Sequence, residues 1–286
     1  MKTLQDIQTI GVVGAGTMGL GIAQMAALAG YKAVLFDAQS EAVPKAMATI
    51  EKNLNKGIEK GKVTEAQRDA AMSNLSSVAT LEEMKVDLVV EAIVEKLDIK
   101  RKVFQTLESV NAPDTILATN TSSIPITQIG ATLEHPERLV GMHFFNPAHI
   151  MKLVEVILGA STAPEVGDTI KAVAQKMGKV AVIAKDSPGF IVNRVARHYY
   201  VEGLKVLEEN VADHATIDDL LESSGFRMGP FRLMDLIGVD TNFSVTTSMF
   251  EAFHQDGKFR PSRIQQKLVD AGHHGRKSGK GFYDYE

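Results

Sequence analysis

The pattern of apolar and polar positions divides the chain into two regions. Up to about residue 185, short apolar runs alternate with segments whose apolar residues recur every three or four positions. The runs are typical of buried strands and the segments of helices. The strands we expect are residues 8–14, 32–37, 86–92, 115–120, the two segments that contain His143 and Glu155, and residues 180–183. The helices we expect are residues 22–29, 41–71 with an interruption near Gly61, 97–110, 126–130 and about 164–177.

This alternation predicts an α/β fold, a Rossmann-type doubly wound sheet that is mostly parallel. From Phe190 to Ala271 the periodicity is helical and no strand is expected. The turn Ser187-Pro188-Gly189 marks the change. We therefore expect a first domain at residues 1–185, with a helical extension at about 41–72, and an all-helical domain at 186–286. The apolar faces of so small a helical domain suggest cover by a partner subunit.

Composition excludes several functions for this 286-residue chain. Its 31 basic and 35 acidic residues nearly balance, so no nucleic-acid or membrane-surface partner is expected. The absence of cysteine removes disulfides, thiolate nucleophiles and cysteine-based metal sites. No signal peptide and no apolar run of membrane-spanning length is evident, and no cluster has metal-ligand spacing. We expect a soluble, cytoplasmic protein without a metal.

A glycine-rich motif follows the first expected strand. It consists of Gly14, Ala15, Gly16, Thr17, Met18 and Gly19, and Asp37 ends the next strand. A strand before such a turn, a helix after it and an acidic residue on the second strand together indicate a dinucleotide site. Asp37 would accept hydrogen bonds from the adenosine ribose, and no arginine follows it to hold a 2′-phosphate, so NAD is favoured over NADP. The alternative is a glycine turn without a ligand.

Two ionisable residues occupy apolar strand segments on either side of the Asn146-Pro147 break. His143 ends the first segment and Glu155 lies on the second. Such residues are seldom placed in strands this apolar unless they are paired or functional. Histidine is the usual general base near neutral pH, and a carboxylate can orient its ring. The alternative is a core histidine and an edge-strand glutamate with separate structural roles.

Several segments in order resemble one family along essentially the whole chain. They are V-G-A-G-T-M-G at 13–19, N-T-S-S at 120–123, G-M-H-F-F-N-P at 141–147, M-K-L-V-E-V at 151–156, D-S-P-G-F-I-V-N-R at 186–194, M-G-P-F at 228–231, G-V-D-T at 238–241 and G-R-K-S-G-K-G-F-Y at 275–283. Together they resemble the L-3-hydroxyacyl-CoA dehydrogenase family, in its short bacterial 3-hydroxybutyryl-CoA dehydrogenase form. The resemblance implies an NAD-dependent oxidoreductase acting on an acyl-CoA, and a homodimer formed through the helical domain.

The resemblance also implies roles for individual residues. His143 matches the catalytic base and Glu155 its partner, and Ser122 and Asn193 match residues that hydrogen-bond the reacting oxygen of the substrate. A further set matches positions on the nicotinamide side of the cofactor or at the strand edge where it binds: Glu95, Lys100, Asn120, Ser122, Asn146 and Lys277. Lys52 and Lys56, in the lysine-rich helical extension, are candidates for the phosphates of CoA. His149 departs from the Val-Pro-Val that follows Asn-Pro in many relatives, which leaves the acyl preference open.

Other interpretations stay open at this point. Ser122 could cap a helix, Asn193 could be an interface amide, Glu95 could be a surface carboxylate, and the lysines of residues 45–62 could form a solvated face. The chain could instead oxidise a sugar acid on the same two-domain plan, or be a non-catalytic protein such as the lens λ-crystallins. Acyl-chain length, direction and pathway are not determined.

Overall fold

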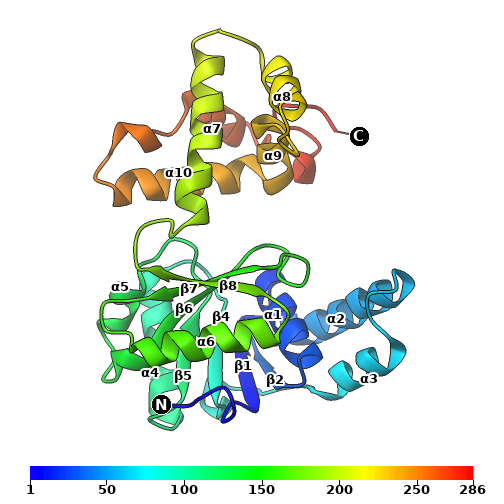
Figure 1. Cartoon of the computed structure of the whole chain (residues 1–286), viewed down its shortest axis with the longest axis vertical. Helices are drawn as coiled ribbons and strands as arrows, with labels where there is room; N and C mark the ends of the chain where they lie inside the picture. The colour runs from blue at the N-terminus through cyan, green and yellow to red at the C-terminus, as the bar shows by residue number, and fades with distance from the viewer. Residues whose placement is uncertain (286) are drawn as a thin grey trace. The chain divides into compact units, whose positions relative to one another are not determined.

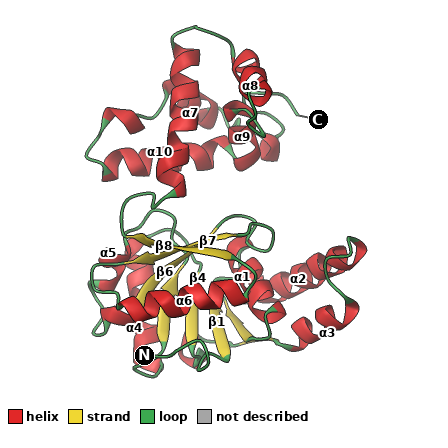
Figure 2. Cartoon of the chain, in the orientation of Figure 1, coloured by secondary structure: helices red, strands yellow, loops and turns green. Residues whose placement is uncertain are grey.

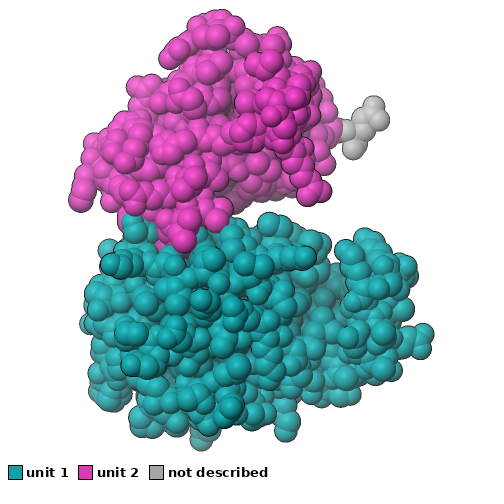
Figure 3. Space-filling view, in the orientation of Figure 1, with its two compact units in different colours: residues 1–187 teal, residues 188–286 magenta. Residues whose placement is uncertain are grey.

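The computed structural model describes residues 1–285 and consists of two compact units, Met1–Ser187 and Pro188–Glu286 (Figure 3). Glu286, the last residue of the expected second domain, lies outside the described residues.

The first unit is built on one eight-stranded sheet (Figures 1 and 2). Its strands are β1 Thr9–Val13, β2 Lys32–Phe36, β3 Leu75–Ser77, β4 Leu88–Glu91, β5 Ile116–Thr119, β6 Leu139–Phe144, β7 Leu153–Leu158 and β8 Val180–Lys185. They lie in the order β3-β2-β1-β4-β5-β6-β7-β8. Neighbouring strands are parallel except β6 and β7, which are antiparallel. The predicted doubly wound, mostly parallel sheet is confirmed.

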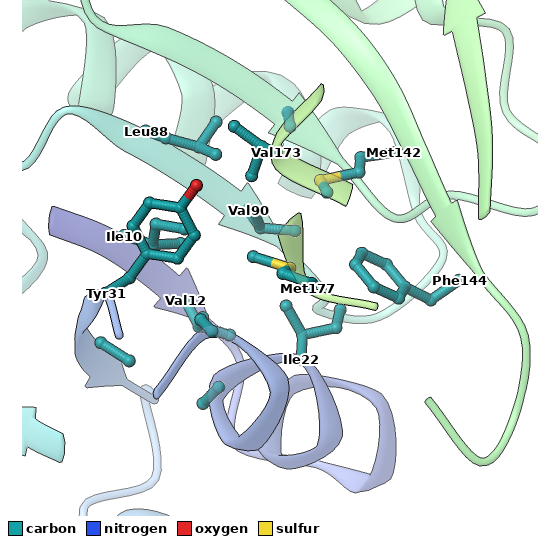
Figure 4. Packing of buried hydrophobic residues seen from close by; sticks show 14 of the residues in the cluster. Ile10, Val12, Ile22, Tyr31, Leu88, Val90, Met142, Phe144, Val173 and Met177 are labelled. Carbon is teal, nitrogen blue, oxygen red and sulfur yellow. The ribbon is translucent and has the colours of Figure 1, made fainter. Parts of the chain in front are cut away.

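Helices cover both faces of the sheet. They are α1 Thr17–Leu28, α2 Ala42–Glu59, α3 Glu65–Ser73, α4 Leu97–Val110, α5 Ile126–Gly130 and α6 Pro164–Lys176. Side chains of α1 and α6 form one buried cluster with the strands, which includes Ile22 and Val173 from the helices and Ile10, Val90 and Met142 from the strands (Figure 4). The other face of β6 packs on α5, since Gly141 lies against Ile126. Central strands buried on both faces explain why their sequences are continuous apolar runs.

The expected long helix at 41–71 is two helices. Gly61 adopts a left-handed φ of 64°, and Thr64 then begins α3 with a capping box in which its side chain accepts from the Gln67 backbone. The interruption near Gly61 is therefore confirmed. Strand β3, which follows α3, was not predicted, because it has three residues and both serines are exposed.

The second unit is helical. Its helices are α7 Val192–Glu208, α8 His214–Ser223, α9 Pro230–Ile237, α10 Val239–Ala252 and α11 Arg263–Asp270. No strand occurs between residues 190 and 271, all of which are described, as the periodicity predicted. The core gathers Tyr200, Leu204, Ile217, Phe231 and Met234.

Two buried carboxylates organise this unit. Asp218 accepts from the Phe231 and Arg232 backbone, and Asp235 accepts from the Phe282 and Tyr283 backbone. They fix the start of α9 and the C-terminal segment. Over the whole described chain, no helix is long and apolar enough to cross a bilayer.

Candidate active site

The strand order reverses between β1 and β4, and this switch point is where doubly wound sheets bind ligands. The glycine-rich turn follows β1 there, and α1 begins at Thr17 without a capping side chain. The first backbone N–H groups of α1 are therefore available to an anion, together with the positive end of its dipole.

Glycine occupies the three motif positions for different physical reasons. Gly14 has a φ of 104°, and a Cβ there would come within 2.6 Å of the Ala92 carbonyl oxygen that follows β4. A Cβ on Gly19 would overlap the carbonyl oxygen of Gly14. Gly16 differs, because a Cβ there would meet no protein atom within 4 Å. Internal packing thus requires Gly14 and Gly19, whereas a Cβ on Gly16 would enter open space beside the turn.

Asp37 stands directly after β2 and beside this turn. One of its carboxylate oxygens accepts from the Ala15 backbone at 2.7 Å, and the other accepts from the Gln39 backbone at 2.9 Å. These contacts fix the carboxylate at the edge where a ribose would lie. The turn, the uncapped helix and Asp37 together fit a dinucleotide.

The segment after β4 is joined to the segment after β5 through Glu95. One oxygen of Glu95 accepts from the Ser122 backbone at 2.9 Å and from the Ser123 backbone at 3.1 Å, and it also accepts from the Thr121 hydroxyl. Its other oxygen lies 3.2 Å from Lys100 Nζ. Burial alone would raise the pKa of Glu95, but the Lys100 charge and these donors outweigh it and hold the pKa below its ordinary value.

The start of α5 decides one alternative for Ser122. Helix α5 begins at Ile126 and its N-cap is Pro125, so Ser122 is not a helix cap. The Thr121 hydroxyl accepts from the Ile124 backbone at 2.9 Å, which closes the turn that carries Ser122. Ser122 therefore stands in a short turn held from both sides.

His143 and Glu155 form a buried pair. They face each other directly in the β6–β7 register, and His143 Nδ1 lies 2.8 Å from Glu155 Oε2. Glu155 is fully buried and 5% of His143 is exposed. Their neighbours Met142, Val154 and Val156 point to the opposite, core face, as strand alternation requires. The strand end is anchored by Asn120, whose side-chain oxygen accepts from the Phe144 backbone at 2.8 Å.

The turn after His143 is held by a lysine that sequence patterns did not single out. Lys179 is buried, and its ammonium donates to the carbonyls of Ala148 and Met151. Asn146 precedes a cis peptide bond to Pro147 in this turn and is exposed. Burial lowers the pKa of His149, and the Lys179 charge lowers it further. This environment disfavours a proton on His149.

The remaining predicted residues lie elsewhere. Lys52 and Lys56 are exposed, one turn apart on α2. Asn193 is in the first turn of α7, and Lys277 lies 2.7 Å from Asp240; both belong to the second unit.

A second residue that the sequence analysis did not identify is Glu91, a fully buried carboxylate that ends β4. The sequence does carry a signal for Glu91, because an acidic residue ends the otherwise apolar run Leu88–Glu91.

A dinucleotide turn at the switch point of a doubly wound sheet, followed by a separate helical unit, defines a nicotinamide-dependent dehydrogenase. Residues 9–187 match the family model described as "3-hydroxyacyl-CoA dehydrogenase, NAD binding domain", and residues 189–285 match its C-terminal domain. The chain belongs to the 3-hydroxyacyl-CoA dehydrogenase family. Its cofactor is NAD, as the sequence predicted.

Individual relatives cover the chain almost completely. A probable 3-hydroxybutyryl-CoA dehydrogenase from Bacillus subtilis is 44% identical over 286 residues, with 98% of each chain covered. A 3-hydroxyadipyl-CoA dehydrogenase from Escherichia coli is 46% identical, but this chain spans only 59% of its length. The crystal structure of (S)-3-hydroxybutyryl-CoA dehydrogenase from Ralstonia eutropha has a TM-score of 0.94 at 38% identity, covering 98% of this chain and 99% of that one.

Proposed function

We propose that the protein interconverts L-3-hydroxyacyl-CoA and 3-ketoacyl-CoA, with 3-hydroxybutyryl-CoA as its main substrate. Family membership and the relatives named for this substrate support the reaction class. The observation that carries the mechanism is the buried contact between His143 and Glu155 at the ligand-binding edge of the sheet. NAD, when bound, accepts or returns the hydride.

In the proposed mechanism, His143 removes the proton from the substrate hydroxyl. Its Nδ1 is engaged by Glu155, so Nε2 takes the proton. The imidazolium that forms would be costly in a buried site, and the Glu155 carboxylate stabilises it. In the reverse direction His143 returns the proton to the developing alkoxide.

Ser122 and Asn193 are proposed to hold the reacting oxygen of the substrate. Ser122 is suited to this because Glu95 and Thr121 fix its turn through backbone hydrogen bonds. A fixed donor lowers the entropic cost of aligning the substrate carbon for hydride transfer. Asn193 has this role from the family resemblance.

Cofactor and CoA contacts complete the proposal. Gly14 to Gly19 and Asp37 bind the pyrophosphate and adenosine ribose, and Glu95, Lys100, Asn120, Asn146 and Lys277 serve the nicotinamide side. Lys52 and Lys56 meet the CoA phosphates, which their exposure on one face of α2 allows.

The decisive assay is NADH consumption with acetoacetyl-CoA, which is measured as the loss of NADH absorbance. Longer 3-ketoacyl-CoAs and 3-ketoadipyl-CoA, the product expected from the substrate named for the Escherichia coli relative, set the acyl preference. NADH formation from L-gulonate tests the sugar-acid alternative. Absence of NADH oxidation with every acyl-CoA would contradict the proposal and favour a non-catalytic role.

We further propose that the protein is a homodimer through its helical unit. On α9, Leu236 is 49% exposed and Ile237 is 44% exposed, although Met234 beside them is fully buried. Light scattering on the wild type should give twice the chain mass, and the L236K/I237K variant should give the single mass. A monomeric wild type would exclude the dimer.

A further inference from the structure

Glu91 is a buried carboxylate that none of the proposed catalytic steps uses. It is the last residue of β4 and has no exposed surface. Its Oε1 lies 2.6 Å from Nζ of Lys100, a residue of α4 that is 1% exposed. Two charges removed from water in this way are tolerated when they are paired and further hydrogen-bonded.

The remaining contacts of Glu91 tie together three elements. Its Oε1 also accepts from the Ile93 backbone at 2.7 Å, and its Oε2 accepts from the Thr119 hydroxyl at 2.7 Å. Glu91 therefore joins the end of β4, the end of β5 and the first turns of α4. Because it is fully buried and both oxygens are engaged, Glu91 cannot touch a substrate and acts only through its neighbours.

Lys100 carries the connection outward to the site. Its ammonium lies between the Glu91 carboxylate and the Glu95 carboxylate, 3.2 Å from Glu95 Oε2. The other oxygen of Glu95 receives the backbone N–H groups of Ser122 and Ser123. A continuous series of charge-assisted contacts thus runs from Glu91 through Lys100 and Glu95 to Ser122.

We infer that Glu91 is a positioning residue for Ser122. Because Lys100 is shared between the Glu91 and Glu95 carboxylates, it engages one oxygen of Glu95, and the other oxygen holds the 121–123 turn. Without the Glu91 charge, Lys100 has Glu95 as its only counter-ion and draws that carboxylate away from the turn. Ser122 then loses its fixed orientation. This inference rests on the proposed function, which assigns Ser122 to the reacting oxygen.

The test is a double-mutant cycle between Glu91 and Ser122, with kcat for acetoacetyl-CoA reduction as the readout. E91Q should lower kcat by about tenfold to a hundredfold, the range expected when a positioned group shifts by about 1 Å. In the S122A background, E91Q should have little further effect, since the group that it positions is already gone. NADH titration, by the fluorescence of bound NADH, reports the folded fraction, so that kcat is expressed per binding site.

A matched control is available on the same helix. Glu108, also on α4, forms an ion pair at 3.3 Å with the buried Arg138, next to the opposite ends of the strands. E108Q removes an ion-paired carboxylate from the same helix, and it should lower thermal stability while leaving kcat unchanged. If E91Q does not fold, E91D replaces it in the double-mutant cycle with S122A. This variant keeps the negative charge but shortens the side chain by one methylene.

The outcomes separate this inference from the function on which it rests. Coupling between positions 91 and 122 supports it. Additive losses, an undiminished kcat in E91Q and E91D, or an equal loss of kcat in E108Q would overturn it. The proposed function fails in a different way, with no turnover of acetoacetyl-CoA by the wild type or equal turnover by the wild type and S122A.

Discussion

His143 and Glu155 are direct partners across the only antiparallel junction of the sheet of the first unit, and His143 Nδ1 lies 2.8 Å from Glu155 Oε2. Because β7 runs antiparallel to β6, two residues that are twelve positions apart in the sequence face each other across the two strands. Both side chains are buried, so the contact between them is shielded from water.

We expect H143Q to lower kcat by about 10²–10⁴-fold, because the base is removed while a similar side-chain volume is kept. NADH affinity should be unchanged, since no dinucleotide contact is proposed for His143. Steady-state kinetics and NADH titration measure the two effects. The matched control is H135Q, in which an exposed histidine paired with Glu137 is changed. Near-normal turnover in H143Q would remove His143 from the mechanism.

The motif glycines should separate folding from cofactor binding. G16A should keep the wild-type thermal midpoint and weaken NADH binding, because a methyl group there meets no protein atom and enters the space proposed for the pyrophosphate. G19A should lower the midpoint or prevent folding, because its methyl group overlaps the Gly14 carbonyl. Thermal unfolding with and without NADH checks both. Equal NADH affinity in G16A and the wild type would contradict the assigned site.

Glu95 should contribute a pH-dependent part of the stability. Its folded-state pKa is lowered, so the contribution is fully present above its ordinary pKa of 4.5 and is lost as the pH falls through the folded-state value. The difference in unfolding free energy between the wild type and E95Q should therefore be constant near neutral pH and shrink below about pH 4.5. Denaturant unfolding at a series of pH values measures it. D98N, at an exposed position on α4, serves as the control, and a difference independent of pH would refute the pairing.

K179M should lower the free energy of unfolding by about 1–3 kcal/mol, because the carbonyls of Ala148 and Met151 lose their donor. The turn that contains Asn146 should loosen, and NADH affinity should fall with it. Urea unfolding and NADH titration measure the two quantities. K152M, at an exposed neighbouring position, should match the wild type in both, and equal stability of K179M and the wild type would show that Lys179 does not hold the turn.

Local sequence determined most of the fold. The helices at 97–110 and 126–130 were predicted with the bounds that the structure has. The reason is that apolar periodicity, glycine turns and proline breaks are properties of short segments. They specify local backbone conformation without contacts between distant residues. The same holds for the glycine-rich turn, whose function follows from its place between a strand and a helix.

The tertiary structure decided which distant residues meet. Sequence patterns gave Glu95 and Lys100 only as cofactor-side residues implied by the family, and they left Glu91 and Lys179 unremarked. The fold shows that Glu91, Lys100 and Glu95 form one series of contacts, which begins at the buried pair Glu91 and Lys100 and ends at the Ser122 turn. Charge burial and long-range hydrogen bonding depend on strand order and register, because neighbouring strands bring together residues far apart in sequence. The chemistry of each residue was therefore determined by the sequence, and its partner by the fold.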